Sequence, residues 1–475
     1  MTAPAFPYIS TRGAAPPATF DDILLAGLAR DGGLYVPEAW PAWTADTLER
    51  WRGHSYAGLA AEICAPFMAG SAAAADLPAL AEASYAGFDD PAVAPLVPLE
   101  DGLYLQELFH GPTLAFKDYA LQLVGRLFDA VLAARGERIT VVGATSGDTG
   151  PAGIAACAGR EAIDIFMLHP AGRTSEVQRR QMTTVPDGNV FNIAVDGTFD
   201  DCQDLVKALF ADDALRDRVN LSAVNSINWA RVMGQIVYYV HAALQVGGQG
   251  NASERAVSFA VPTGNFGNVF AGYGARRCGL PVGRLIVGSN ANDILTRFFR
   301  HNAMEIRGVT PTLSPSMDIQ VSSNFERLLF DLLDRDGAAV ESAIRAFRTG
   351  GSLPLDEARW QRATALFRGA SLDDEGTIGL MRSVFERTGR QIDPHTAVGL
   401  AAARECRGGG DPVVVLATAH PAKFPDAVER ATGRRPALPP HLADLHARAE
   451  RCVTMAKDSA RLTDYVLANA RTVRG

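Results

Sequence analysis

The chain has 475 residues, of which 47% are hydrophobic and 21% are charged, as expected for a globular protein with two or three domains. Its formal net charge of −8 argues against nucleic acid as a main partner, and no stretch is long and apolar enough for a membrane span. The six cysteines lie far apart without a CxxC pair, so we expect reduced thiols in the cytoplasm and neither a disulfide framework nor a metal site.

Residues 1–98 are predicted to form a separate N-terminal unit, and residues 99–475 the rest of the protein. The pattern of the unit predicts a short strand at 8–11, a helix at Phe20–Leu28, and a turn from Asp31 that feeds a second strand terminated by Pro37. Helical stretches are predicted near 45–53, 55–69 and 76–87. Three prolines, at 91, 95 and 98, are typical of a linker. No catalytic constellation occurs in this unit, so we interpret it as a scaffold.

Lysine is rare in this chain, which holds 41 arginines and only four lysines: Lys117, Lys207, Lys423 and Lys457. Arginine stays protonated in proteins, whereas a desolvated lysine can lose its proton and attack a carbonyl group. Lys117 follows a turn, His110–Thr113, and precedes a helical pattern over Asp118–Arg135, so its amine is expected at a helix start. This setting predicts Schiff-base chemistry at Lys117, and chance retention of a surface lysine is the alternative.

Beyond residue 99, short apolar runs alternate with helical patterns, which favours βαβ units and a parallel sheet. The predicted strands are Ile139–Gly143, Ile163–Leu168, Val190–Val195, Val257–Val261, Arg284–Gly288 and Val413–Thr418. The later stretch Ala338–Ser371 has a polar helical pattern, and residues 436–475 form an amphipathic tail with no evident chemistry. Ligands of such a sheet bind beyond the carboxyl ends of its strands.

The turn Gly143–Gly150 follows the first of these strands and carries three glycines and three hydroxyl side chains. Backbone N–H groups at a helix N-terminus favour negative charge, so this turn is a candidate anion site. It lacks the GK[ST] ending of a P-loop, and the chain has no GxGxxG motif, so a nucleotide-binding module is disfavoured. An ordinary capped turn between strand and helix is the alternative.

A second glycine loop, Pro262–Asn268, follows another predicted strand and suggests a second anion site, although a generic loop would look similar. Two such sites fit a phosphorylated cofactor together with a phosphorylated substrate. The stretch Asn225–Arg231 adds a guanidinium suited to phosphate beside residues that could be plain helix caps. After the last strand, Thr418 offers a hydroxyl, whereas His420 and Lys423 could equally be structural.

The stretch Leu108–Asp118, LFHGPTLAFKD, resembles the pyridoxal-phosphate lysine motif of the threonine synthase family. The similarity runs from Tyr8 to about Val428 and includes YISTRG, LARDGGLYVPE, GATSGDTG and GNFGN. It implies an α/β fold of fold-type II, in which an N-terminal domain joins two lobes with parallel-type sheets that enclose pyridoxal 5′-phosphate. The smaller lobe is expected at roughly 138–230 and the larger one in the remainder of 99–475.

The resemblance also implies roles for individual residues. Lys117 would bond to the cofactor and shuttle protons, Asp148 would stand near the pyridine hydroxyl, and Thr418 would meet the pyridine nitrogen. The residues implied to bind the cofactor phosphate are Gly264, Asn265, Phe266, Gly267 and Asn268. Those implied to bind the substrate are Thr145, Ser146, Gly147, Thr149, Asn225, Ser226 and Arg231. The stretches Ser314–Asp318 and Ser322–Arg327 also match and are expected to shape the wall of the site.

The implied activity converts O-phospho-L-homoserine and water to L-threonine and phosphate, by γ-elimination followed by β-addition of water, in a monomer or homodimer. Two alternatives remain open at this point. A related lyase could use the same lysine and cofactor but release a 2-keto acid, and a catalytically inactive binding protein could share the fold.

Overall fold

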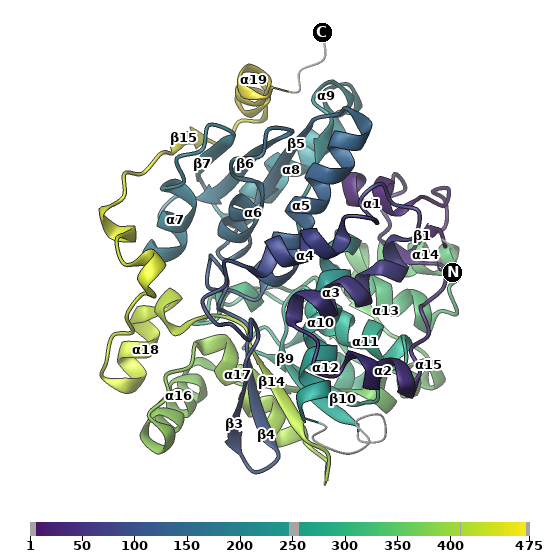
Figure 1. Cartoon of the computed structure of the whole chain (residues 1–475), viewed down its shortest axis with the longest axis vertical. Helices are drawn as coiled ribbons and strands as arrows, with labels where there is room; N and C mark the ends of the chain where they lie inside the picture. Colours follow the sequence, from purple (N-terminus) through teal and green to yellow (C-terminus); the bar gives the residue numbers. More distant parts are fainter. Residues whose placement is uncertain (1–5, 247–255, 409, 472–475) are drawn as a thin grey trace.

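The computed structural model describes residues 6–246, 256–408 and 410–471, and two sheets form the centres of two lobes (Figure 1). The larger sheet has six strands in the order β13-β10-β9-β14-β4-β3. Their bounds are Phe367–Ser371, Val282–Ser289, Val257–Pro262, Val413–Ala417, Leu103–Glu107 and Leu96–Glu100. All neighbours run parallel except the edge strand β3, which pairs antiparallel with β4. The carboxyl ends of the parallel strands therefore meet at one edge of the sheet.

The smaller sheet has five parallel strands in the order β15-β7-β6-β5-β8. Their bounds are Val453–Ala456, Val190–Asp196, Ile163–Pro170, Ile139–Ala144 and Leu221–Ser222. Every residue of β6 is buried, as expected for a central strand covered on both faces. The helices of this lobe are α6 (Thr149–Cys157), α7 (Glu176–Thr183), α8 (Phe199–Ala211), α9 (Asp213–Arg218) and α19 (Ser459–Asn469).

Two long helices, α5 (Lys117–Arg135) and α10 (Trp229–Val246), pack against each other. Helix α5 also contacts α6 of the smaller lobe, and α10 contacts α11 of the larger one. The remaining helices of the larger lobe are α11 (Gly267–Arg277), α12 (Ile294–His301), α13 (Phe325–Leu332), α14 (Gly337–Gly350), α15 (Glu357–Leu366), α16 (Asp374–Thr388), α17 (Pro394–Cys406) and α18 (Pro425–Thr432). Short elements complete it: η2 (Pro315–Met317), η3 (Pro421–Lys423), η4 (Pro440–Leu442), η5 (Leu445–Ala447), β11 (Met304–Glu305) and β12 (Ser352–Leu353).

The N-terminal region docks on α5 and α10 through a buried aromatic cluster. The ring of Trp229, at the start of α10, lies 6.0 Å from Tyr8 and 5.9 Å from Phe67, and the Tyr8 hydroxyl donates to the Phe67 carbonyl at 2.6 Å. The elements of this region are β1 (Tyr8–Ser10), α1 (Phe20–Ala26), β2 (Tyr35–Pro37), α2 (Ala45–Trp51), α3 (Tyr56–Cys64), η1 (Ala65–Met68) and α4 (Leu77–Tyr85). Among the described residues, no helix has the length and apolarity needed to cross a membrane.

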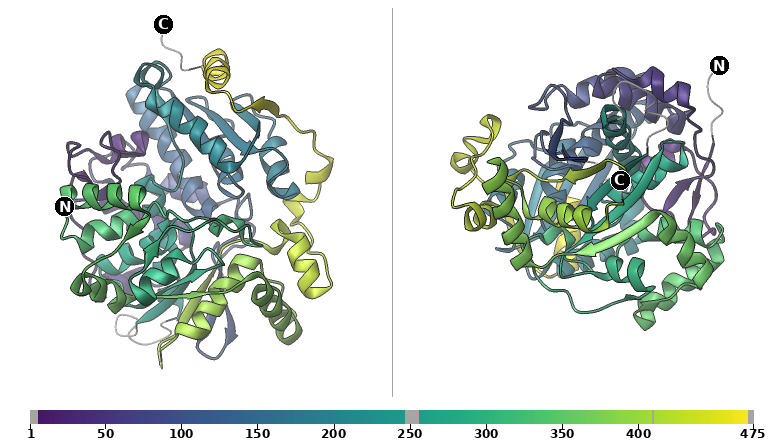
Figure 2. Two further views of the ribbon diagram at one scale, coloured as in Figure 1. Left: turned by 180° about the vertical axis from the view of Figure 1, so that it is seen from behind. Right: turned by 90° about the horizontal axis from the view of Figure 1, so that it is seen from below.

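The six predicted strands are confirmed to within two residues at each end, and the predicted helix after Lys117 begins at Lys117 itself. Two expectations were wrong. The end of the stretch predicted as helical, Phe367–Ser371, is the edge strand β13. The proline-rich linker contains β3, where Pro98 is tolerated because an edge strand can lack an N–H donor. The amphipathic C-terminal tail also contributes a strand, β15, and Figure 2 shows this segment returning from the larger lobe to the smaller one.

Candidate active site

A cavity with about 640 Å³ of empty space lies between the two lobes, next to the first turns of α5, α6, α10 and α11. Eleven of the fifteen predicted site residues line it: Lys117, Asp148, Thr149, Ser226, Arg231, Gly264, Asn265, Phe266, Gly267, Asn268 and Thr418. The fold therefore brings together loops that follow strands of both sheets. Thr145, Ser146, Gly147 and Asn225 lie close by without lining the cavity.

Lys117 is the first residue of α5, and its side chain is buried. The backbone before it is anchored to the larger sheet, because the Phe116 amide donates to the Thr418 carbonyl at 2.9 Å. Burial lowers the pKa of the Lys117 amine to about 8; Asp148 opposes this shift, and the positive charges of Arg231 and Lys423 reinforce it. The neutral, nucleophilic amine is therefore accessible at mildly alkaline pH.

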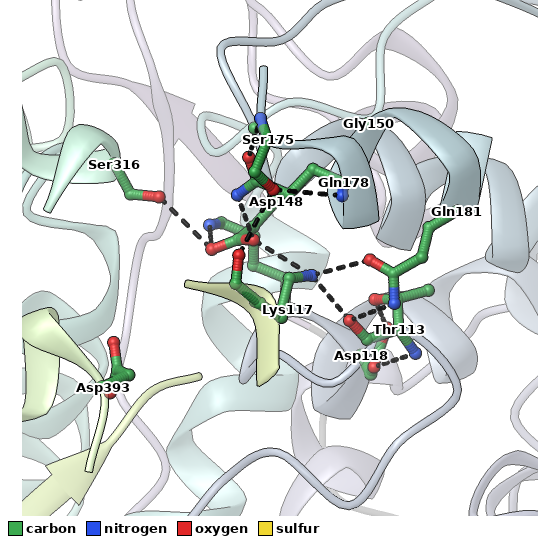
Figure 3. A network of polar contacts seen from close by, with 12 residues as sticks. Thr113, Lys117, Asp118, Asp148, Gly150, Ser175, Gln178, Gln181, Ser316 and Asp393 are labelled. Carbon is green, nitrogen blue, oxygen red and sulfur yellow. Dashed lines mark hydrogen bonds and ion pairs between the residues drawn. The ribbon is translucent and has the colours of Figure 1, made fainter. Parts of the chain in front are cut away.

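Asp148 is the centre of a buried polar network (Figure 3). One carboxylate oxygen, Oδ2, lies 3.5 Å from Lys117 Nζ, whereas the other, Oδ1, lies 3.0 Å from Lys423 Nζ. Gln178 Nε2 donates to Oδ1 at 2.9 Å, and Ser316 Oγ donates to Oδ2 at 3.3 Å. Burial by itself raises the pKa of Asp148, but the two lysines hold it well below its usual range. The carboxylate is therefore ionised within the cavity wall.

The turn after β5 is braced by Thr145. Its hydroxyl accepts the backbone amides of Gly147 and Gly150, both at 3.0 Å, and donates to the Gly147 carbonyl at 3.0 Å. A Cβ at Gly147 would lie 2.8 Å from Gln178 Nε2, so a side chain there would displace the amide that donates to Asp148. The hydroxyl of Thr145 thus shapes the turn, and Thr149 is the hydroxyl residue of this turn that lines the cavity.

The second glycine loop leads into α11 and has the features of a phosphate site. A Cβ at Gly264 would lie 2.5 Å from the Ser316 carbonyl oxygen, so the close approach of these two backbone segments requires glycine at this position. Phe266 adopts a left-handed conformation with φ of 63°, and the helix begins directly after it. The side-chain nitrogen Nδ2 of Asn268 is buried and has no hydrogen-bond partner among the described residues. The first N–H groups of α11 have no intrahelical acceptor, so the loop is suited to a phosphate group.

Arg231 lies in the first turn of α10 with 3% of its surface exposed. Its Nη1 donates to the Val224 carbonyl at 3.3 Å, but its Nε has no partner, and it forms no ion pair with any described residue. Burial lowers the pKa of the guanidinium to about 10, so it is charged at neutral pH. Ser226 lines the cavity nearby, whereas exposed Asn225 accepts the Ile227 amide at 3.2 Å as a cap does. A buried cation without a counterion favours an anionic ligand.

The sequence did not single out His395 and Gln235, which also line the cavity. His395 Nδ1 lies 2.8 Å from an oxygen of Asp393, the N-cap of α17, and its Nε2 lies 3.4 Å from the Ser316 amide. An aspartate followed by proline is a recognisable helix start, but only the fold turns the following histidine toward Ser316. Ser316 and Met317 line the wall, as expected for their stretch. His420 instead accepts the Ala422 amide at 3.1 Å and caps η3.

Three family models match the chain. Residues 7–85 match the threonine synthase N terminus, residues 89–352 match the pyridoxal-phosphate dependent enzymes, and residues 396–466 match the C-terminal model of threonine synthase. The match to the second of these covers more than half of the chain and includes Lys117, Asp148, Arg231 and the loop at 263–268.

Characterised relatives and solved structures agree with these matches. The threonine synthase of Pseudomonas aeruginosa is 55% identical over 97% of both chains, and that of Saccharomyces cerevisiae is 41% identical over 89% of this chain and 88% of the relative. The crystal structure of a threonine synthase from Brucella melitensis with bound PLP superposes with a TM-score of 0.94 at 49% identity, over 98% of this chain and 100% of the other. The yeast threonine synthase structure gives a TM-score of 0.91 at 38% identity, over 98% and 99%.

Proposed function

Because the chain belongs to the threonine synthase family of pyridoxal-phosphate-dependent lyases, we propose that it converts O-phospho-L-homoserine and water to L-threonine and phosphate. The observation that supports this substrate best is that one cavity holds two separate groups of residues suited to anions. One is the loop at the N-terminus of α11, and the other is buried Arg231, which has no carboxylate partner among the described residues. A phosphorylated cofactor and a phosphorylated substrate together satisfy both sites.

The cavity residues fit pyridoxal phosphate. Lys117 offers an amine of lowered pKa, the backbone of Gly264–Asn268 offers a phosphate cradle, and Thr418 offers a hydroxyl to the pyridine nitrogen. When bound, the cofactor supplies the electron sink that stabilises negative charge on the substrate carbons. A hydroxyl partner for the pyridine nitrogen would stabilise the protonated ring less than a carboxylate would.

The chain's own residues bind the substrate and move protons. Arg231 holds the substrate phosphate, with Ser226 and Thr149 beside it, and keeps the leaving group in place while its bond to Cγ breaks. Lys117 takes a proton from Cα and returns protons to the carbon chain, because its amine is buried and its pKa is lowered to about 8. The turn at 145–147 holds the substrate carboxylate at the start of α6, where backbone N–H groups favour negative charge.

The enzyme is proposed to act in the cytoplasm as a monomer or homodimer. All six cysteines are free thiols in the structure, four of them buried, which fits a reducing compartment.

The test is incubation of the purified holoenzyme with O-phospho-L-homoserine while both phosphate and threonine are measured. Equal amounts of the two products are expected, and unphosphorylated homoserine should give neither. Phosphate accompanied by a 2-keto acid in place of threonine would instead identify a related lyase, and a protein that binds the cofactor without releasing phosphate would be a binding protein.

A further inference from the structure

Lys423 is the most deeply buried lysine of the chain, with none of its surface exposed, and the mechanism above gives it no step. It ends η3, directly after β14 of the larger sheet. Its ammonium group has three partners: the Thr113 carbonyl at 2.6 Å, Asp148 Oδ1 at 3.0 Å and Gln181 Oε1 at 3.1 Å. A fully buried charge is costly unless it is paired and hydrogen-bonded, and these three contacts provide the pairing that Lys423 needs.

The partners of Lys423 come from segments that are distant in sequence. Asp148 occupies the position before α6 and Gln181 lies on α7, both in the smaller lobe, whereas Thr113 belongs to the loop that leads to Lys117. Lys423 itself comes from the larger lobe. Its ammonium group therefore joins both lobes and the loop before Lys117 at a single point.

The Asp148 carboxylate is shared between two lysines, one at each oxygen. The contact with Lys423, at 3.0 Å, is shorter than the contact with Lys117, at 3.5 Å. Gln178 reinforces the Lys423 side by donating to the same Oδ1 at 2.9 Å. The shorter contacts of the carboxylate are therefore at Oδ1, the oxygen that faces Lys423, and the contact with the Lys117 amine at Oδ2 is the longer one.

This division of contacts matters for Lys117. A carboxylate paired with Lys117 alone would favour its protonated form, which cannot attack a carbonyl group or accept a proton. The other charged or titratable groups near the pair are Arg231 on α10, His395 on α17 and Asp118 on α5. Asp118 is itself held by the amide and hydroxyl of Thr113, at 2.8 and 2.6 Å. Apart from Lys117 itself, Lys423 is the cation that the described residues place in direct contact with Asp148.

We propose that Lys423 is a positioning residue that binds and neutralises Asp148, so that Lys117 can act as a neutral amine. This inference rests on the proposed chemistry at Lys117. Lys423 acts through Asp148 and does not touch the substrate.

Four variants of the holoenzyme test the proposal: Lys423→Met, Asp148→Asn, the double variant, and the control Lys207→Met. Lys207 is exposed and pairs with Asp204 at 3.3 Å. The readout is the visible absorbance of the lysine-bound cofactor, titrated with pH in the absence of substrate, with bound cofactor measured for each variant. The pH dependence of kcat/KM for threonine formation is measured in parallel.

Lys423→Met should raise the midpoint of the absorbance titration by about one unit or more, a tenfold change in proton affinity, because Asp148 then acts on Lys117 alone. Asp148→Asn should lower the midpoint. The double variant should return to near the wild-type midpoint, and Lys207→Met should not change it. This pattern separates charge balance from a loss of packing, since packing defects would accumulate in the double variant.

A Lys423→Met midpoint equal to that of the wild type would overturn the proposal and leave Lys423 a purely structural residue. If Lys423→Met does not fold, the decision falls to the other two variants, and the proposal is overturned if Asp148→Asn leaves the midpoint in place or the double variant stays displaced. The titration needs no substrate, so an enzyme that fails to make threonine would refute the proposed function without affecting this result.

Discussion

Arg231 offers the sharpest test of how the cavity binds its substrate. Replacing it by methionine removes a buried cation that has one hydrogen bond, to the Val224 carbonyl at 3.3 Å, and no ion pair with a described residue. Desolvation of this charge is a cost that the folded protein bears without a substrate. We therefore expect Arg231→Met to fold with an unchanged or higher thermal midpoint, although it loses activity.

The size of the loss follows from the environment of the guanidinium. A charge-assisted hydrogen bond contributes about 1.5–3 kcal/mol, and truncation of one partner of a desolvated charge pair costs about 2–5 kcal/mol. A loss of about 2–4 kcal/mol in transition-state stabilisation corresponds to a roughly 30- to 900-fold fall in kcat/KM. The cofactor should stay bound with an unchanged spectrum, because its phosphate is proposed to lie at the α11 loop.

Arg327 provides a matched control, because it is equally buried but fully used by the fold. Its Nε donates to the Tyr35 carbonyl at 3.0 Å, its Nη2 donates to the Ile227 carbonyl at 2.6 Å, and Asn324 accepts from Nη1. Arg327→Met should lower the thermal midpoint markedly. The assays are phosphate release from O-phosphohomoserine, bound cofactor by absorbance, and thermal unfolding. If Arg231→Met lost the cofactor while kinetics per bound cofactor stayed normal, the two anion sites would have been exchanged; a midpoint falling as far as that of Arg327→Met would refute the desolvation argument.

Three further predictions concern the cofactor and the response to pH. Lys117→Arg keeps the charge but removes the amine, so visible absorbance and turnover should vanish, and a borohydride-fixed cofactor on another lysine would contradict this. Gly264→Ala places a Cβ 2.5 Å from the Ser316 carbonyl, so cofactor affinity should fall at least about tenfold in an equilibrium titration. An unchanged affinity would remove this loop from the phosphate site. Burial lowers the pKa of His241 from about 6.5 to about 4. As the pH falls through this range, the histidine is protonated in the unfolded chain but not in the folded one, so the free energy of unfolding decreases between pH 6.5 and pH 4. When the pH falls from 7 to 5, the thermal midpoint of His241→Phe should therefore fall less than that of the wild type. Equal falls in the two proteins would show that His241 does not contribute to the pH dependence.

The strands buried on both faces could be predicted from the sequence, and the peripheral ones could not. β6 and β9 are buried at every residue and mostly apolar, and a turn or glycine signal bounds each of them. β13 lies at the edge of its sheet and has an exposed serine and a half-buried arginine among its five residues, so its pattern merges with the preceding helix α15. β3 contains a proline, which in a sequence indicates a linker as readily as an edge strand.

The candidate site could be predicted where a loop carries its own signal. The glycine loop before α11 is such a case, because its residue types alone indicate a cradle for an anion. A hydroxyl or amide at a turn is harder to interpret: the side chains of Thr145 and Asn225 bond within their own turns, and the sequence of a cap resembles that of a ligand. Lys423 and His395 could not be given roles, because the contacts of Lys423 and the Ser316 contact of His395 come from segments that only the fold brings together.

The smaller sheet depends on a strand that is synthesised long after its neighbours. β7 ends at Asp196, whereas β15, which covers its outer edge, begins at Val453. Until β15 is made, the lobe that carries Asp148 presents an open row of backbone donors and acceptors, which is a template for pairing with another chain. During synthesis, a nearly complete lobe is therefore prone to aggregation for a long interval, which ends only when β15 pairs with β7.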